Sequence, residues 1–311
     1  MVCKNCINNP VIKLTNNDVS LCKGHFIRYF EKKVMKTIAG FSLIKPNEKI
    51  GVAVSGGKDS LTVLHILSLV KEKKPIEIEA LLIDEGIKDY RDKTILDAKK
   101  FCNEHKIKLK IVSYKKEFGY SLDEMLKVLK IKPCSICGVF RRYLLNKKSK
   151  DFGYDKLATG HNLDDEAQSV MMNQFRSNME TSARLGPITG IVEDKRFIKR
   201  IKPLYLVTEK EVATYSFIKG FTTNFVECPN SGGSYRNHIR DFINDFENKF
   251  PGSKHGIINS FLQILPILKK EIKFVKIQSC KNCGEATSKE LCQACVLVYK
   301  LKSSVKQKQS L

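Results

Sequence analysis

The stretch "VAVSGGKDS", residues 52–60, joins a short apolar run to an amphipathic helical pattern. Its glycines let the backbone bend so that successive N–H groups point at one spot, and a helix that begins near Asp59 adds the positive end of its dipole. Phosphate is the ligand that such a turn suits. The GxxxxGK[ST] spacing of a Walker loop is absent, so the turn is too short to wrap a β-phosphate. Taken alone, the turn also fits a helix start capped by Ser and Asp.

Four soft metal ligands lie near each end of the chain, arranged as two close pairs. Two such pairs supply a tetrahedral zinc site, and a closed set of four leaves no open position for chemistry. The short segments hold too few apolar residues to fold without a metal, which argues against unliganded cysteines. We therefore expect a structural zinc ribbon at each end. The expected ligands are Cys3, Cys6, Cys22 and His25 at one end and Cys280, Cys283, Cys292 and Cys295 at the other.

A third cysteine group lies between the ribbons. Cys134 and Cys137 form a CxxC in "KPCSICGVFRR", and Cys228 follows much later in "ECPNSGG". Three thiolates are one short of a closed zinc site or a fully ligated iron–sulfur cluster. On these residues alone an open cluster, a cysteine persulfide with a resolving partner and a CxxC that merely packs all remain possible. The last cysteine, Cys102, lies on a helical pattern and is predicted to be a packed thiol.

The formal net charge of the chain is +22, and its lysines and arginines are spread along the whole length. Such an excess favours a polyanionic partner, because each neutralised phosphate releases condensed counterions. A lysine-rich proteome is the alternative explanation. No stretch approaches the ~20 apolar residues of a membrane span, and the amino terminus lacks the order of a signal peptide. We expect a cytoplasmic protein that binds nucleic acid and no membrane.

Strand-like and helix-like segments alternate through the middle of the chain. This alternation predicts right-handed βαβ units, and hence an α/β fold with a parallel sheet and helices on both faces. Ligands of such sheets bind at the carboxyl ends of the strands, so the turns "SGGKDS", "DEGI" and "GHNLDDE" are expected to meet there. The expected strands are 49–54, 78–84, 108–114 and 155–160, and the expected helices are 59–71, 90–104, 121–129 and 162–175. From about 208 the pattern is mainly helical.

The strand followed by Ser55-Gly56-Gly57-Lys58-Asp59-Ser60 resembles the PP-loop signature of the N-type ATP pyrophosphatases, and "LIDEGI" and "GHNLDDEAQ" continue the resemblance. With both ribbons and the central cysteines, the sequence is similar over essentially its whole length to the TtuA/TtcA-type tRNA 2-thiouridine synthetases. Within them it resembles the TtuA-like group that includes the cytoplasmic wobble-uridine thiolases. The resemblance implies a PP-loop, HUP-like fold that binds ATP with Mg²⁺.

The resemblance also implies roles for single residues. Lys58 would act as a cation, Asp59 as a magnesium ligand and Asp165 as a catalytic carboxylate. Arg141 would be catalytic too, although some relatives carry Lys at this position, a difference that favours the wobble-uridine branch. The residues implied to bind ATP are Ala53, Val54, Ser55, Gly56, Gly57, Lys58, Asp59, Ser60, Asp84, Gly160 and Asp165. Helix capping is the alternative role of the carboxylates in "GHNLDDEAQ".

In the family the cysteine trio, here Cys134, Cys137 and Cys228, holds a 4Fe-4S cluster whose fourth iron is open to an exogenous sulfur. The implied enzyme is an ATP-dependent tRNA sulfurtransferase that adenylates C2 of a uridine and replaces its oxygen with sulfur. The uridine is at the wobble position or in the T-loop, and the wobble position is favoured. A persulfide enzyme, a PP-loop enzyme with an amine acceptor and a zinc-ribbon RNA-binding scaffold are the alternatives.

The implied partners are tRNA, a second copy of the chain and a sulfur donor. The donor is a ubiquitin-like thiocarboxylate protein, a desulfurase or free sulfide. Candidate RNA-contacting arginines are Arg142, Arg176, Arg184, Arg236 and Arg240. The expected organisation is a zinc ribbon at 1–27, the catalytic domain at 28–220, a helical segment with Cys228 and tRNA contacts at 221–278, a second ribbon at 279–300 and a disordered tail at 301–311.

Overall fold

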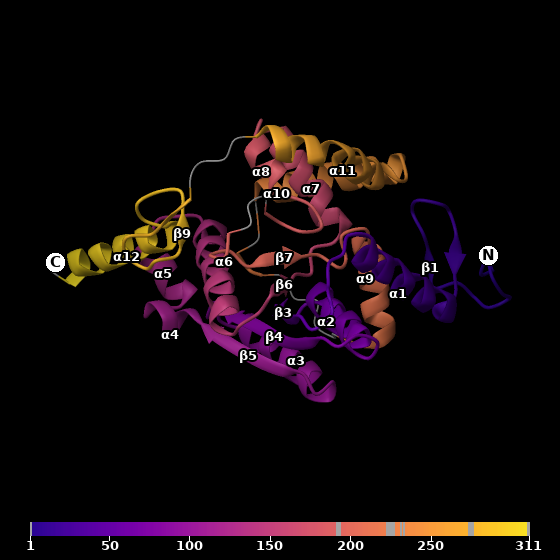
Figure 1. Cartoon of the computed structure of the whole chain (residues 1–311), viewed down its shortest axis with the longest axis horizontal. Helices are drawn as coiled ribbons and strands as arrows, with labels where there is room; N and C mark the ends of the chain where they lie inside the picture. The colour runs from indigo at the N-terminus through magenta and orange to yellow at the C-terminus, as the bar shows by residue number, and fades with distance from the viewer. Residues whose placement is uncertain are drawn as a thin grey trace.

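A five-stranded parallel sheet forms the centre of the protein (Figure 1). The structure is a computed structural model, which describes residues 2–190, 194–221, 228–230, 232, 234–272 and 277–309. In chain order the strands are β3 (Lys49–Val54), β4 (Glu77–Asp84), β5 (Lys108–Ser113), β6 (Lys156–Ala158) and β7 (Lys199–Ile201). Their spatial order is β5-β4-β3-β6-β7, and every neighbouring pair is parallel. The predicted α/β fold is confirmed, and β7 is an additional strand.

Helices cover both faces of the sheet, as β4 shows. Ala80 and Leu82 pack into one apolar cluster, whereas Leu81 and Ile83 pack into another. Successive side chains of a strand point to opposite faces, so both faces are buried. The first face is covered by α1 (Lys23–Gly40), α2 (Lys58–Lys71), α3 (Arg91–Glu104) and α9 (Glu209–Lys219). The second is covered by α4 (Tyr114–Phe118), α5 (Leu122–Val128), α6 (Pro133–Asp151) and α12 (Gln293–Gln309).

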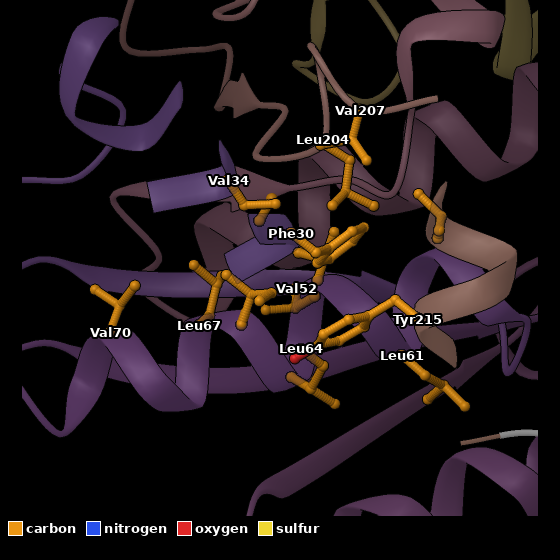
Figure 2. Packing of buried hydrophobic residues seen from close by; sticks show 14 of the residues in the cluster. Phe30, Val34, Val52, Leu61, Leu64, Leu67, Val70, Leu204, Val207 and Tyr215 are labelled. Atoms are coloured by element: carbon orange, nitrogen blue, oxygen red, sulfur yellow. The ribbon is translucent and has the colours of Figure 1, made fainter. Parts of the chain in front are cut away.

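The first cluster fixes α2, and with it the glycine turn that precedes this helix. Figure 2 shows Leu61, Leu64 and Leu67 of α2 packed among side chains of β3, α1 and α9. Phe30 of α1 stacks on Tyr215 of α9, with ring centroids 4.1 Å apart. Because this side of α2 is dry and closely packed, the start of the helix has little freedom to move relative to β3.

A further group of helices lies beyond β7: α7 (Leu163–Gln174), α8 (Met179–Ala183), α10 (Tyr235–Lys249) and α11 (Ser253–Glu271). Their apolar contacts form a third cluster. The fully or nearly fully buried members are Leu163, Ala167, Val170, Tyr205, Ile258, Phe261 and Leu265. This packing joins the carboxyl-terminal helices to α7, which follows strand β6.

The predicted ribbons lie at opposite ends of the molecule (Figure 1). Each contains a two-stranded antiparallel sheet, β1 (Ile12–Lys13) with β2 (Ser20–Leu21) and β8 (Gln278–Ser279) with β9 (Ala286–Thr287). The structure differs from the disordered tail expected at 301–311, because α12 continues to Gln309 and Leu301 is buried in the second cluster. Among the helices described, none is long and apolar enough to cross a membrane.

Candidate active site

The turn between β3 and α2, called the cradle below, has the geometry of an anion-binding turn. Ser55 N donates to Ser60 Oγ over 3.1 Å, and Ser60 Oγ donates to the Gly57 carbonyl over 2.9 Å. Gly56 has φ +84°, and a Cβ there would lie 2.1 Å from the Thr94 carbonyl oxygen, so a side chain would not fit. Among the described residues, no side chain caps the first turn of α2. Its N–H groups therefore remain available to an anionic ligand.

Lys58 lies at the start of α2 between two carboxylates. Its Nζ is 2.9 Å from Glu209 Oε1 and 3.1 Å from Asp59 Oδ2. Burial of the side chain opposes its charge, but the charges of Asp59 and Glu209 outweigh that cost and raise the pKa of Lys58. The lysine is therefore a permanent cation beside the cradle.

The turn after β6 packs directly on the glycine turn. A Cβ at Gly160 would lie 3.0 Å from backbone atoms of Asp59 and Ser60. Asn162 donates from Nδ2 to Asp59 Oδ1 over 2.9 Å, and its Oδ1 accepts from the backbone N–H of Asp164 and Asp165. Thus Asn162 both caps α7 and holds Asp59, which is why this helix and the cradle keep a fixed relation.

Asp165 is set apart from an ordinary surface carboxylate. Its Oδ2 accepts from the Asn162 N–H over 3.2 Å, and Arg236 Nη1 lies 3.9 Å from its Oδ1. Burial is the main reason that the pKa of Asp165 rises to about 6, and the charges of Asp59 and Glu209 add to the rise. The capping interpretation is correct for Asn162, but Asp165 is in addition a carboxylate of unusual basicity beside the cradle.

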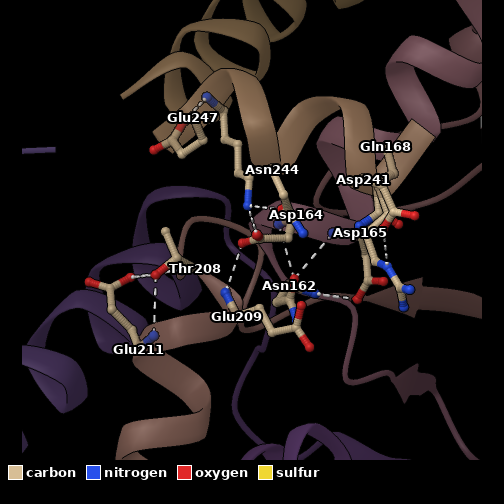
Figure 3. Close-up of polar contacts among 12 residues, drawn as sticks. Asn162, Asp164, Asp165, Gln168, Thr208, Glu209, Glu211, Asp241, Asn244 and Glu247 are labelled. Atoms are coloured by element: carbon tan, nitrogen blue, oxygen red, sulfur yellow. Dashed lines mark hydrogen bonds and ion pairs between the residues drawn. The ribbon is translucent and has the colours of Figure 1, made fainter. Parts of the chain in front are cut away.

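Figure 3 shows a second layer of contacts that holds α7 in place. Buried Asp164 accepts from the Glu209 N–H over 2.8 Å and pairs with Lys254 of α11. Lys254 also donates to Asn244 of α10 over 2.6 Å. Two helices from the carboxyl-terminal half are thereby tied to the residue before Asp165.

The remaining residues expected to bind nucleotide lie at the same edge of the sheet. Ala53 and Val54 end β3 and pair with Leu81 and Leu82 of β4. Asp84 ends β4, and its Oδ1 accepts from the Gly86 N–H over 2.9 Å. The strands β3, β4 and β6 thus deliver all three predicted turns to their carboxyl ends, where ligands of parallel sheets bind.

Glu85 and Arg91 are site residues that the sequence prediction missed. Arg91 Nη1 donates to the Ser55 carbonyl over 3.0 Å, so it helps to hold the backbone of the cradle in place. Its guanidinium pairs with Glu85, which is 1% exposed, and Arg141 Nη1 of α6 lies 3.8 Å from the same carboxylate. Neither Glu85 oxygen makes a regular hydrogen bond within the described chain, so the two guanidinium charges compensate its burial.

Arg141 connects Glu85 to the cysteine trio, because it lies on the same helix as Cys134 and Cys137. Cys134 and Cys137 lie in the first turns of α6, and Tyr114 Oη donates to the Cys137 carbonyl over 2.9 Å. Cys134 Sγ lies 3.4 Å from the carbonyl oxygen of Asn230, two residues after Cys228. Burial raises the pKa of Cys137, Arg141 opposes the rise, and the charge of Cys228 adds to it. The described part of the 228 segment therefore lies against the start of α6.

The two terminal ligand sets are compact. In each set the four candidate ligand atoms lie within 4.8 Å of one another, as a single tetrahedral ion requires. Cys280, Cys292 and Cys295 are buried against the sheet-covering helices of the second face. Cys102 is confirmed as a packed thiol: it is 1% exposed, and burial raises its pKa to about 11.

Of the candidate RNA-contacting arginines, Arg236 belongs to the site, because it donates to Gln168 and Ser169 of α7 beside Asp165. Three others contact residues outside the cradle: Arg176 lies over the Tyr235 ring, Arg184 is 3.9 Å from Glu180 and Arg240 is 3.3 Å from Asp241. Arg142 follows Arg141 on α6 and is exposed.

Comparison with known proteins agrees with this geometry. The PP-loop domain family matches residues 27–246. A tRNA-5-methyluridine(54) 2-sulfurtransferase from Pyrococcus horikoshii is 39% identical over 95% of this chain and 93% of its own length. Cytoplasmic tRNA 2-thiolation protein 1 from Xenopus laevis is 35% identical over 95% of this chain and 87% of its own.

A solved structure extends the likeness to three dimensions. The U34-tRNA thiolase NcsA from Methanococcus maripaludis, solved with its [4Fe-4S] cluster, superposes with a TM-score of 0.83 at 35% identity, covering 97% of this chain and 96% of that one. The likeness runs over nearly the full length in sequence and in fold. This chain belongs to the PP-loop ATP pyrophosphatases, in the family of tRNA 2-thiolation proteins that these relatives represent.

Proposed function

We propose that this protein is an ATP-dependent tRNA sulfurtransferase that converts the wobble uridine of tRNA to 2-thiouridine. One observation carries the proposal: Glu85 pairs with Arg91, which supports the phosphate cradle, and also lies beside Arg141 on the helix of Cys134 and Cys137. A site for nucleotide and a set of sulfur ligands are thus linked by a single buried carboxylate. The activities of its relatives support the same assignment.

The first half-reaction is activation of the uridine by ATP. The turn amides and Lys58 would hold the phosphates, and Asp59 would hold the Mg²⁺ ion that offsets phosphate charge. The C2 oxygen of the uridine attacks the α-phosphorus, the bond to the β-phosphate oxygen breaks, and pyrophosphate leaves. Asp165 accepts the N3 proton of the base as the oxygen attacks. A carboxylate whose pKa is about 6 is largely ionised at neutral pH and more basic than a surface carboxylate, which suits this role.

The second half-reaction requires a sulfur nucleophile at C2. Cys134, Cys137 and Cys228 are soft ligands, and three of them fit a 4Fe-4S cluster with one iron free of protein ligands. Bound there, the cluster would supply that open iron as the position for the incoming sulfur atom. Arg141 lies within the same charge network as Cys137 and Glu85, so its cation offsets thiolate charge at the start of α6. AMP departs from C2 when sulfur adds.

The wobble position is favoured by the solved U34-tRNA thiolase. The Pyrococcus relative, by contrast, acts on a 5-methyluridine at position 54. Nucleoside mass spectrometry separates the two sites. The chain with reconstituted iron and sulfide is incubated without oxygen with ATP, Mg²⁺, sulfide and tRNA carrying cytidine at position 34 or at position 54.

Loss of 2-thiouridine with the position-34 variant alone is the expected result. Loss with the position-54 variant alone would move the reaction to the T-loop, and no 2-thiouridine in any tRNA would overturn the assignment. ATP–pyrophosphate exchange without thiolation would instead favour a PP-loop enzyme with a different acceptor.

The same proposal includes the partners and the organisation of the chain. Each terminal ligand set holds one Zn²⁺, since four buried or half-buried soft ligands lie within 4.8 Å of one another. The catalytic domain spans 28–220, the segment at 221–278 adds Cys228, and ribbons at 1–27 and 279–300 flank them. We place the protein in the cytoplasm, as two copies, with sulfur from a thiocarboxylate protein, a desulfurase or free sulfide.

A further inference from the structure

Two arginines, one on the cysteine helix and one on β7, have no acidic partner among the residues that the structure describes. Arg142 of α6 is exposed, and Arg200 of β7 is half-buried. The Arg142 guanidinium folds back over Gly138, where a Cβ would lie 3.1 Å from Nη1. Arg200 Nη2 in turn lies 3.5 Å from the Arg142 carbonyl oxygen. Within the described ranges no carboxylate pairs with either guanidinium.

The positive charges of Arg142 and Arg200 are close together and partly shielded from water, which disfavours their charged forms. Desolvation, together with the charges of Arg142 and Arg141, lowers the pKa of Arg200 to about 10. Desolvation also lowers the pKa of Arg142, and Arg141 adds to that effect. A neighbouring cation is neutralised locally, by contrast: Lys202, two residues after Arg200, pairs with Glu166 at 2.7 Å. A group of cations left without such an acid is stabilised when an anion binds.

The position of these arginines separates them from the phosphates of ATP. The cradle follows β3, and the residues expected near the rest of the nucleotide lie on β3 and β4. Arg200 lies on β7, paired with Leu157 of β6, and so on the opposite side of β3 from β4. Arg142 lies five residues beyond Cys137 on α6, and Arg200 reaches its carbonyl oxygen. The two arginines therefore join the cysteine helix to β7, the edge strand beyond β6.

We propose that Arg142 and Arg200 bind a backbone phosphate of tRNA next to the uridine that enters the site. The inference rests on the proposed function, because a uridine must leave its stack to reach the cradle and its neighbouring phosphates then need fixed partners. Guanidinium groups suit this task, since their forked donors match two phosphate oxygens at once. A side chain at Gly138 would require the Arg142 guanidinium to shift slightly from this position.

The test measures binding of a fluorescent anticodon stem-loop that contains U34, with the full chain and without thiolation. For Arg200→Gln and Arg142→Gln we expect the Kd to rise about tenfold, and the salt dependence of log K to become shallower by about 0.7 per lost phosphate contact. Arg200→Lys should keep the salt slope but lose affinity, because it keeps the charge without the fork. Arg28→Gln, on α1 of the opposite part of the molecule, is the matched control and should leave both unchanged.

A methylphosphonate on either side of U34 then removes one phosphate charge at a time. At the linkage that the arginines hold, it should weaken binding by the wild-type chain and have no further effect on Arg200→Gln. If the methylphosphonate at either linkage and Arg200→Gln weakened binding additively, the site would be overturned. It would also be overturned if the arginine variants raised the KM for ATP or lowered the bound iron while their RNA affinity was unchanged. A wild-type chain that binds no RNA would overturn the proposed function itself, whereas a thiolating chain indifferent to Arg200→Gln overturns this site alone.

Discussion

Asn162 donates its side-chain amide to the Asp59 carboxylate over 2.9 Å, across 103 residues of sequence. The same side chain caps α7 and fixes Asp165. One amide thus positions both carboxylates of the proposed reaction, Asp59 as the Mg²⁺ ligand and Asp165 as the acceptor of the uridine N3 proton. A change at Asn162 should therefore affect both the start of α7 and the proposed activity.

Asn162→Ala should lower thiolation by about a hundredfold, because displacement of catalytic groups by about 1 Å has that effect, and should cost about 1 kcal/mol of stability as a lost cap. Asn178→Ala is the control. Asn178 caps α8 through the Thr181 N–H at 3.2 Å, away from the cradle, so its loss should reduce stability without reducing kcat. Equal activity of the two variants in a thiolation assay would contradict the coupling.

The activity should depend on the ionisation of Asp165. Since its folded-state pKa is about 6, the base is present above pH 6 and is lost as the pH falls through that value. We expect single-turnover adenylation to decline below pH 6 and to be almost absent in Asp165→Asn. A profile that is flat between pH 5 and 7 would rule out a proton-accepting role.

The raised pKa of Asp165 also predicts how its ionisation affects the stability of the fold. A carboxyl whose pKa rises from 3.8 to about 6 on folding destabilises the native state once ionised, so its unfavourable contribution grows as the pH rises through this interval. Asp165→Asn should therefore be at least as stable as the parent chain at neutral pH in urea unfolding. A marked loss of stability would assign Asp165 a structural role instead.

Glu85→Gln should damage both half-sites together. It leaves Arg91 and Arg141 without their shared carboxylate, and breaking a buried ion pair costs about 3–5 kcal/mol. We expect weaker ATP binding and lower iron retention in one variant. Glu180→Gln removes an exposed partner of Arg184 and should cost less than about 1 kcal/mol with neither binding function changed. Loss of ATP binding alone would show that Glu85 does not link the sites.

Zinc content tests the terminal ligand sets. Cys295→Ala should remove the carboxyl-terminal ion and leave the amino-terminal one, and the buried packing of that ribbon against α6 and α5 should loosen. Cys102→Ala removes a cysteine from the core and should leave zinc content unchanged. Metal analysis by mass spectrometry measures both. Full zinc content in the Cys295 variant would show that this cysteine is not a ligand.

Most of the sheet could be predicted from local patterns. Long apolar strands such as Glu77–Asp84 and the turn chemistry of 55–60 each carry a strong local signal. By contrast, β7 has three residues inside a basic stretch, and pairing with β6 rather than its own sequence makes it a strand. The tail prediction was wrong because the spacing of Leu297 and Leu301 continues an amphipathic helix whose partner surface is distant in sequence.

The site residues that belong to sequence motifs could be predicted, whereas those that are defined only by tertiary contacts could not. Asp59, Asp165 and the cysteines stand in recognisable spacings, so the sequence indicates them directly. Glu85 follows Asp84 in a turn and shows nothing unusual until Arg91 and Arg141 meet it from two helices. Sequence motifs identify residues with reactive side chains, but they miss residues whose role depends on contacts made only in the folded structure.

The central claim is that the cradle and the cysteine trio serve one reaction in sequence. The most direct measurement follows tRNA-dependent ATP–pyrophosphate exchange and 2-thiouridine formation together in Cys134→Ala, Cys137→Ala and Cys228→Ala. We predict that each variant retains exchange, loses iron and forms no 2-thiouridine. Continued 2-thiouridine formation by any of the three, or a wild-type chain that thiolates tRNA without consuming ATP, would contradict the account.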